Sequence, residues 1–175
     1  MKIRNLFKLA LLSVTTPILV TCGETQEEVL AYPSVEACIN AGQQDESVCR
    51  SEFEKAQQLH NQVAPRYSSA SQCYSDFGYN RCRQSSSSTW LPFMMGYMLA
   101  PRGGAGYIAT QPLYRPSSDP NGYYTGGAGR IGRVSSNGQT KIAASKASRP
   151  APAVRTRTVA RGGFGARAAG RSAGG

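Results

Sequence analysis

WLPFMMGYMLAP, residues 90–101, is the least polar run of the chain after its N-terminal segment. A helix over residues 90–100 would be about 16 Å long, too short for the roughly 30 Å hydrocarbon core of a bilayer. Three interpretations remain. The run packs on the rest of the chain and completes a core, lies in a membrane interface, or binds a partner protein. In the last two, the contact residues are Trp90, Phe93, Met94, Met95 and Tyr97.

The composition predicts a small folded part. The chain has 175 residues, 19 of them Gly, and from about residue 84 onward Ser, Gly, Ala, Arg and Pro dominate. Such sequence buries too little apolar surface to offset the entropy lost on ordering. The folded part is then about 55 residues long, a size at which a hydrophobic core alone is marginal. The expected fold is a small all-α, disulfide-stapled module followed by a largely disordered Gly/Arg-rich tail.

The expected segments follow from this composition. They are a signal peptide (1–21), a tether (22–31), a four-Cys helical module with two repeat units (32–83), a Ser-rich linker (84–89), an apolar segment with a Gly/Tyr-rich region (90–132) and a disordered basic tail (133–175).

Charge is divided along the chain, whose total net charge is +10. Residues 23–64 hold eight acidic and two basic residues, a net charge of −6, whereas residues 102–175 hold twelve basic residues and one acid, a net charge of +11. A basic segment of this kind is attracted to anionic surfaces, and the attraction weakens as salt is added.

The N-terminus is typical of an exported protein. Basic residues in MKIRNLFK precede the short apolar stretch Leu9–Val20 and the small residues that follow it, as in a secretory signal peptide. LVTC, residues 19–22, resembles a bacterial lipobox, in which Cys22 is acylated and becomes the new N-terminus, although Thr21 departs from the usual small residue. The residue after Cys22 is Gly23, not the Asp that usually retains a lipoprotein in the inner membrane. By resemblance to that sorting rule, we expect delivery to the outer membrane, facing the periplasm. The rival readings are a plain signal peptide with an incidental cysteine and an uncleaved anchor.

Of the five cysteines, one is interpreted as the acylated residue and the other four as two disulfide pairs. With Cys22 acylated, Cys38, Cys49, Cys73 and Cys82 remain, and export places them where disulfides persist. Four cysteines allow three pairings. A repeat with an offset of 35 residues, YPSVEAC (32–38) and YSSASQC (67–73), favours two similar local bridges, Cys38–Cys49 and Cys73–Cys82. Gaps of eleven and nine residues differ from those of zinc sites, so we expect no metal.

Three helices are predicted in this module. Each repeat is a short helix, capped by Ser34 or Ser69 and ended by Gly42 or Gly78. Residues 46–63 form an amphipathic helix that ends before Pro65, with a stripe of Cys49, Phe53, Ala56, His60 and Val63. His60, the only histidine, has no evident nucleophile or carboxylate partner. We therefore expect neither an enzyme nor a cofactor.

The Arg-rich end predicts an anionic partner. RTRTVARGGFGARAAGRSAGG resembles the Arg-Gly segments of RNA-binding proteins, but export excludes intracellular nucleic acid. The remaining partners are lipid phosphates, lipopolysaccharide, cell-wall carboxylates and extracellular DNA, or none for a merely solvated tail. The expected contacts are Arg155, Arg157, Arg161, Arg167 and Arg171. The pattern Gly127-x-Gly129-x-x-Gly132 lacks the strand and helix that a dinucleotide site requires.

Several stretches together carry a family resemblance. The terminal cysteine of the signal, the four-Cys module with APRY (64–67), WLPFMMGYM, QPLY (111–114) and RGGFG (161–165) resemble the YgiB family of Gram-negative envelope proteins over nearly the whole mature chain. The resemblance implies an envelope protein with a biofilm-formation label and no catalytic residues. It also implies a neighbouring gene for an ATP-grasp ligase similar to glutathionylspermidine synthase.

Three functional hypotheses follow. The first is a non-enzymatic cell-envelope lipoprotein that contacts the membrane or an envelope protein partner through its apolar segment and basic tail. The second is an adhesive protein that binds the matrix or another anionic polymer. The third is a substrate of the amide ligase, modified at the C-terminal Gly174–Gly175.

Overall fold

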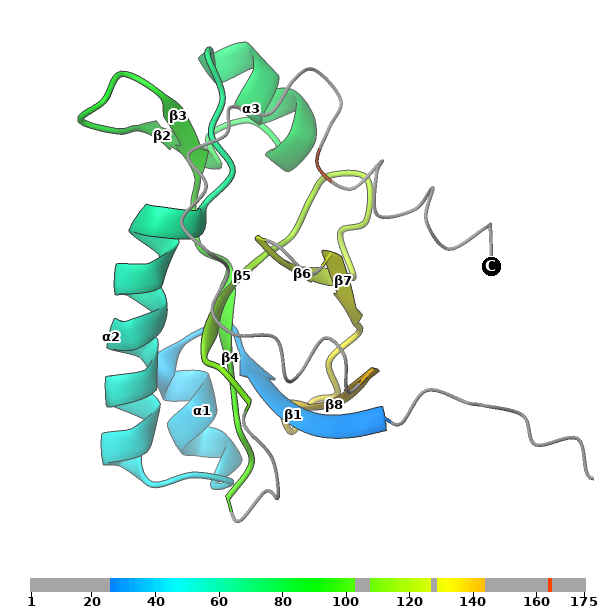
Figure 1. Cartoon of the computed structure of the whole chain (residues 1–175). Coiled ribbons are helices and arrows are strands. Elements are labelled where there is room, and N and C mark those ends of the chain that lie inside the picture. Colours follow the sequence, from blue (N-terminus) through cyan, green and yellow to red (C-terminus); the bar gives the residue numbers. More distant parts are fainter. Residues whose placement is uncertain (1–25, 103–107, 127–128, 144–163, 165–175) are drawn as a thin grey trace, which may run out of the picture.

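The computed structural model describes residues 26–102, 108–126, 129–143 and 164, which form three helices and eight strands (Figure 1). The helices are α1 (Val35–Ala41), α2 (Glu46–Val63) and α3 (Ala70–Phe77). The strands are β1 (Gln26–Tyr32), β2 (Cys82–Gln84), β3 (Trp90–Pro92), β4 (Gly96–Leu99), β5 (Gln111–Tyr114), β6 (Tyr123–Thr125), β7 (Gly129–Gly132) and β8 (Gln139–Ala143).

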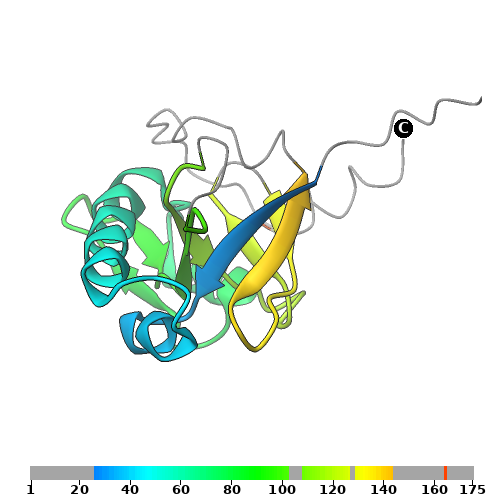
Figure 2. The ribbon, with the colours of Figure 1, turned by 90° about the horizontal axis from the view of Figure 1, so that it is seen from below.

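Six strands form one antiparallel sheet in the order β7-β6-β5-β4-β1-β8. The first and last strands of this order, β7 and β8, also contact each other, so the sheet curls into a nearly closed barrel. Figure 2 shows β1 and β8 side by side on the flank away from α2. β2 and β3 form a separate two-stranded sheet.

Alternate residues of the strands fill two cores. Val29 and Ala31 of β1 face the barrel interior, where they meet an apolar cluster completed by Met98, Leu113, Ile131 and Ile142. Leu30 and Tyr32 point the other way and pack with Tyr97, Leu99 and residues of α1 and α2. This period-two pattern is what an antiparallel sheet covered by helices on one face requires. A third cluster fills the space between α3, β3 and β5.

The all-α prediction is wrong, because most regular segments after residue 78 are strands. The expected tether 22–31 contains most of β1, which lies between β4 and β8 in the sheet. The tail expected to be disordered from residue 133 contains β8. The strands after residue 78 are only three to five residues long, so each needs few inward apolar side chains. A Gly- and Ser-rich composition therefore did not exclude a folded sheet.

The helix predictions are confirmed. The backbone N–H of Ala37 donates to Ser34 Oγ at 3.2 Å, and that of Gln72 donates to Ser69 Oγ at 3.4 Å, as N-caps require. α1 ends at Gly42, whose φ of 63° is the left-handed conformation of a C-cap. α2 spans the predicted residues 46–63.

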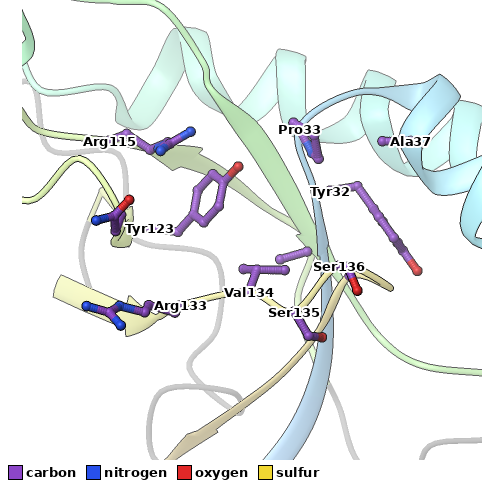
Figure 3. Close-up of a pocket in the computed structure, with 12 residues that line it drawn as sticks. Tyr32, Pro33, Ala37, Arg115, Tyr123, Arg133, Val134, Ser135 and Ser136 are labelled. Atoms are coloured by element: carbon purple, nitrogen blue, oxygen red, sulfur yellow. The ribbon is translucent and has the colours of Figure 1, made fainter.

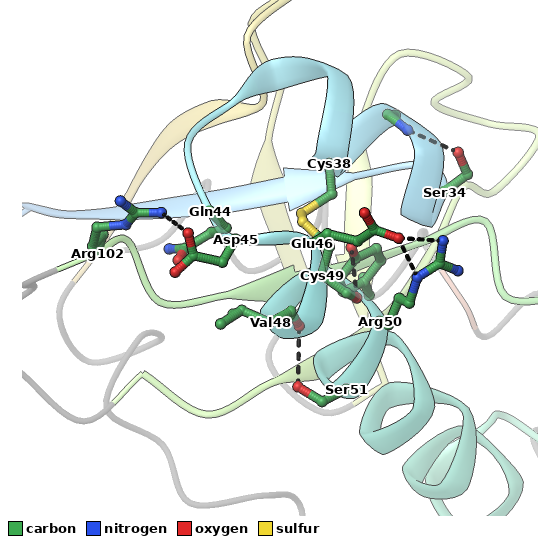
Figure 4. The surroundings of a disulfide bond; sticks show 12 residues. Ser34, Cys38, Gln44, Asp45, Glu46, Val48, Cys49, Arg50, Ser51 and Arg102 are labelled. Atoms are coloured by element: carbon green, nitrogen blue, oxygen red, sulfur yellow. Dashed lines mark hydrogen bonds and ion pairs between the residues drawn. A yellow bond between two sulfur atoms is a disulfide. The ribbon is translucent and has the colours of Figure 1, made fainter.

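Both expected disulfides are present. Cys38–Cys49 joins α1 to α2 (Figure 4), and Cys73–Cys82 joins α3 to β2. All four cysteines are buried. The first bridge therefore ties α1 to α2, and the second ties α3 to the two-stranded sheet, with sequence separations of 11 and 9 residues.

The apolar run 90–101 completes the core. Leu91, Tyr97, Met98 and Leu99 are each at most 2% exposed, and β4 is paired on one side with β1 and on the other with β5. Trp90, Met94 and Met95 are half-buried, and Phe93 is 42% exposed. Of the five side chains expected to contact a membrane or a partner, Tyr97 is thus inaccessible in the folded chain.

Two glycines allow the backbone to approach Tyr32 closely. A Cβ on Gly96 would lie 2.6 Å from the Tyr32 carbonyl oxygen. A Cβ on Gly138 would overlap the Tyr32 ring, and the φ of Gly138 is 84°. Only glycine fits at both places, and both contacts fix the end of β1.

Removing either bridge should lower stability measurably. We expect the double variants Cys38→Ala/Cys49→Ala and Cys73→Ala/Cys82→Ala each to lose about 2–3 kcal/mol of unfolding free energy, because a short loop is then open in the unfolded chain. Urea unfolding without reductant measures the loss. Cys22→Ser, which removes a thiol from neither bridge, is the control and should unfold like the wild type. An unchanged midpoint in either double variant would contradict this role.

Candidate anion-binding site

A cavity of about 620 Å³ opens at one end of the barrel-like sheet. β1, β5 and β7 end here, and β6 and β8 begin here. The lining residues are Ala31, Tyr32, Pro33, Ala37, Arg115, Asn121, Tyr123, Arg133, Val134, Ser135, Ser136 and Gly138. Figure 3 shows Arg115, Tyr123 and Arg133 on one side of the cavity, opposite Pro33, Ala37 and Tyr32.

The two arginines lie directly after the ends of β5 and β7, where the cavity opens. Leu113 of β5 and Ile131 of β7 belong to the interior cluster, and Arg115 and Arg133 lie two residues further along the chain. Because side chains two apart share a face of a strand, Arg115 continues the interior row of β5 beyond the strand end. Before Arg133 this alternation is interrupted by the irregular pairing of β7 with β6 and by Gly132, whose φ is 113°, and the Arg133 side chain is exposed at the cavity. At this end of the barrel the arginine side chains reach water. Their charge is therefore not buried, although the interior residues Leu113 and Ile131 nearby are apolar.

Arg115 is held in place without a carboxylate. Its guanidinium donates to the Pro120 carbonyl oxygen, from Nε at 2.9 Å and also from an Nη, and its Cζ lies 5.3 Å from the centre of the Tyr123 ring. The Tyr123 ring and the Pro120 carbonyl oxygen orient the guanidinium. Because neither partner is ionised, they do not neutralise its positive charge. Among the residues that the structure describes, neither Arg115 nor Arg133 forms an ion pair.

The nearest acid in sequence is engaged elsewhere. Asp119 accepts from Arg130 Nε at 2.7 Å and from the Tyr124 hydroxyl at 3.1 Å. The hydrogen bond from Arg130 lowers the pKa of Asp119, so this carboxylate stays ionised and paired. None of the described residues that line the cavity is acidic, and its two arginines give this lining a positive charge.

This arrangement suits an anion. Two guanidinium groups can bind phosphate or carboxylate oxygens, and Asn121 and Ser136 add polar groups to the lining. The Ser135 hydroxyl donates to the Gln139 carbonyl oxygen at 2.6 Å. Pro33, Ala37 and Val134 add an apolar wall. Within the described ranges no group of three or more His, Cys, Asp or Glu side chains is placed to hold a metal ion.

His60 lies in the core, away from the residues that line the cavity. Its Nδ1 is 3.0 Å from the Tyr114 hydroxyl, and its side chain is 6% exposed. Burial, with a smaller contribution from the charges of Arg83 and Arg66, lowers the pKa of His60 to about 4. Burial also raises the pKa of Tyr114. The neutral imidazole therefore joins α2 to β5 as a structural hydrogen-bonding partner.

The predicted site residues are only partly placed. Cys22 and the five arginines Arg155, Arg157, Arg161, Arg167 and Arg171 lie outside the described residues. No helix among the described residues has the length and apolar character needed to cross a membrane. Sequence reasoning missed Arg115 and Arg133. The available signal was an arginine directly after each of two short segments, QPLY and GRIG, that form strands.

The fold and the cavity define a small disulfide-containing β protein with a cationic cavity at one end of its sheet. The chain belongs to the family described as "Protein of unknown function (DUF1190)", whose profile matches residues 26–175. This membership is consistent with the family resemblance seen in the sequence.

Relatives in this family cover most of the chain. A UPF0441 protein of Klebsiella pneumoniae subsp. pneumoniae is 30% identical over 181 residues, which is 93% of this chain and 81% of the relative. A UPF0441 protein of Yersinia pestis bv. Antiqua is 30% identical over 172 residues, 85% of this chain and 74% of the relative. One of Erwinia tasmaniensis is 31% identical over 181 residues, 93% and 81% respectively. No solved structure matches the chain.

The buried histidine predicts a specific acid sensitivity. Because the folded pKa of His60, about 4, lies below its ordinary value of 6.5, its contribution to stability is full above pH 6.5 and is lost as the pH falls toward 4. Between pH 7.5 and 4.5 we expect the wild type to lose about 2 kcal/mol more unfolding free energy than His60→Gln, which keeps an amide for Tyr114 but does not titrate. Urea unfolding at both pH values measures this. Equal losses would mean that His60 is protonated in the folded chain.

Proposed function

We propose that this protein is a non-enzymatic component of the bacterial cell envelope that binds an anionic group in its arginine cavity. The observation that carries the proposal is the pair Arg115 and Arg133 at one cavity whose described lining contains no acidic residue. Phosphate and carboxylate are the groups that guanidinium binds best. Lipid phosphates, lipopolysaccharide and cell-wall carboxylates all present such groups outside the inner membrane.

The lining of the cavity supports binding without catalysis. The described residues that line it include Tyr32, Tyr123, Ser135 and Ser136, which carry hydroxyls, but no His, Cys, Lys, Asp or Glu. A hydroxyl nucleophile needs an adjacent base, and none lies among the lining residues. His60, the histidine of the chain, is instead buried against Tyr114.

The envelope location and the lipid anchor at Cys22 remain part of the proposal, as does the finer assignment to the YgiB family. The support is the signal-like N-terminus, LVTC, and the pairing of the other four cysteines. Strand β1 begins at Gln26, four residues after Cys22. An acyl chain on Cys22 would therefore hold the start of β1 within about 14 Å of the membrane surface.

The other hypotheses from the sequence stay predictions. A link to biofilm formation, an envelope protein partner, and binding of matrix polymer by the basic tail depend on residues or partners that the described ranges do not contain. Modification of Gly174–Gly175 by an amide ligase also falls outside those ranges. Phe93, the exposed aromatic of the apolar run, is the residue of that run best placed to touch a membrane or a partner.

Titration with pyrophosphate tests the cavity. We expect saturable chemical-shift changes at Arg115, Arg133, Ser135 and Gly138 in nuclear magnetic resonance spectra. Arg115→Gln and Arg133→Gln should each weaken binding about tenfold, since each removes a charge-assisted hydrogen bond.

Arg83→Gln is the matched control. It removes the same charge from β2, where Arg83 donates to Asn61 Oδ1 at 2.9 Å outside the cavity, and should leave the affinity unchanged. If Arg83→Gln weakens binding as much as Arg133→Gln, the anion responds to net charge alone and the proposed site is wrong.

The lipid anchor makes a separate prediction. Cells fed radioactive palmitate should label the wild-type protein, and Cys22→Ser should lose the label because the acceptor thiol is gone. The double variant Cys73→Ala/Cys82→Ala, which keeps Cys22, controls for loss of label through misfolding. Full labelling of Cys22→Ser would exclude the anchor while leaving the cavity proposal intact.

A further inference from the structure

Phe164, from the RGGFG stretch near the C-terminus, packs on the folded domain. Its ring centre lies 5.0 Å from that of Phe77, 5.9 Å from that of Tyr114 and 6.1 Å from that of Tyr124. Its backbone N–H donates to Asp76 Oδ2 at 3.3 Å. We call Phe77, Tyr114, Tyr124 and Asp76 the aromatic site.

The aromatic site is assembled from three elements of the fold. Phe77, Tyr114 and Tyr124 are each at most 5% exposed and come from α3, β5 and β6. The Tyr67 hydroxyl donates to Asp76 Oδ2 at 2.8 Å, and the backbone N–H of Ser117 donates to the Asp76 carbonyl oxygen at 2.8 Å. These bonds fix the acceptor to which the N–H of Phe164 donates. The site thus combines an aromatic surface with one oriented acceptor.

The sequence around Phe164 suits such a site. Glycines at 162, 163 and 165 flank the phenylalanine, so no neighbouring side chain hinders the approach of the backbone to Asp76. A peptide N–H and one aromatic ring are what the aromatic site can recognise. Arg161 and Arg167 lie three residues on either side of Phe164.

We propose that the aromatic site is a docking site for a Gly-Phe-Gly segment, filled by Phe164 of the same chain, where ring packing and the bond to Asp76 tie the basic C-terminal segment to the domain. This inference is independent of the anion-binding proposal. Docking places the Cα atoms of Arg161 and Arg167 within about 11 Å of that of Phe164, given the reach of three residues.

A covalent connection favours the chain's own segment over an added one. Tethering raises the effective concentration of the docked residue to the millimolar range. If the segment alone binds with a dissociation constant of about 0.1 mM, an added peptide would bind the wild type about tenfold more weakly than a variant whose own segment cannot dock. The comparison between the two chains therefore reports cis docking directly.

The test uses the full-length protein and a synthetic peptide of residues 160–169, ARGGFGARAA. The peptide should bind Phe164→Ala about tenfold more tightly than the wild type, with chemical-shift changes at Phe77, Tyr114 and Tyr124. A peptide with Ala in place of Phe164 should bind neither chain. Phe93→Ala, which removes an exposed aromatic outside the aromatic site, is the matched control and should bind the peptide as weakly as the wild type.

Several outcomes would overturn the proposal. Equal affinity of the peptide for the wild type and Phe164→Ala would show that the segment does not occupy the aromatic site. Equal binding of the peptide that lacks phenylalanine would reduce the contact to charge attraction. A concentration-dependent dimer that Phe164→Ala abolishes would place the segment on a second copy.

A second measurement does not depend on the variant folding. In the wild type, nuclear Overhauser effects between Phe164 and the rings of Phe77 and Tyr114 should be seen at low protein concentration. Their absence in a folded wild-type chain would also exclude cis docking.

Discussion

Burial of β1 on both faces is the constraint on which the rest of the structure depends. Val29 and Ala31 lie in the barrel interior while Leu30 and Tyr32 pack under the helices, and all four are at most 2% exposed. The strand pairs along its length with β8 and at its end with β4. Without β1, β4 and β8 would both have an unpaired edge and the two apolar cores would open to water.

The end of β1 also forms part of the cavity wall. Tyr32 ends β1, and its close approach to Gly96 and Gly138 sets the distance between β1 and the loop from β7 to β8. That loop carries Val134 and Ser135 of the cavity wall and follows Arg133. Core contacts of Tyr32 thus help to position the loop that forms this part of the cavity wall.

The helices and bridges were predictable because their signals are local. Ser34, Ser69 and Gly42 act within one helical turn of their own position, and the bridges close loops of 11 and 9 residues. The strands were not predicted, because QEEVLAY acquires partners from residues about 70 and 110 positions away in the sequence. One local signal was overlooked. Asn137–Gly138, between β7 and β8, is the dipeptide most typical of a hairpin turn.

The two arginines could not be assigned from the sequence for the same reason. Arg115 and Arg133 are 18 positions apart in the sequence and line one cavity because β5 and β7 both pair with β6. The region that contains both arginines is rich in Gly, Ser and Arg, a composition that disordered segments share. Neither its composition nor its charge could therefore show that these arginines line a cavity and do not belong to a solvated tail.

The cavity and the aromatic site are built on opposite faces of the same two strands. Tyr114 and Arg115 are consecutive at the end of β5, and Tyr123 and Tyr124 are consecutive in β6. One residue of each pair lines the cavity and the other contacts Phe164. A short strand cannot move one face without moving the other, because adjacent residues share a backbone whose hydrogen bonds fix the register. The side chains proposed to bind an anion and those proposed to hold the C-terminal segment are therefore mechanically joined through β5 and β6.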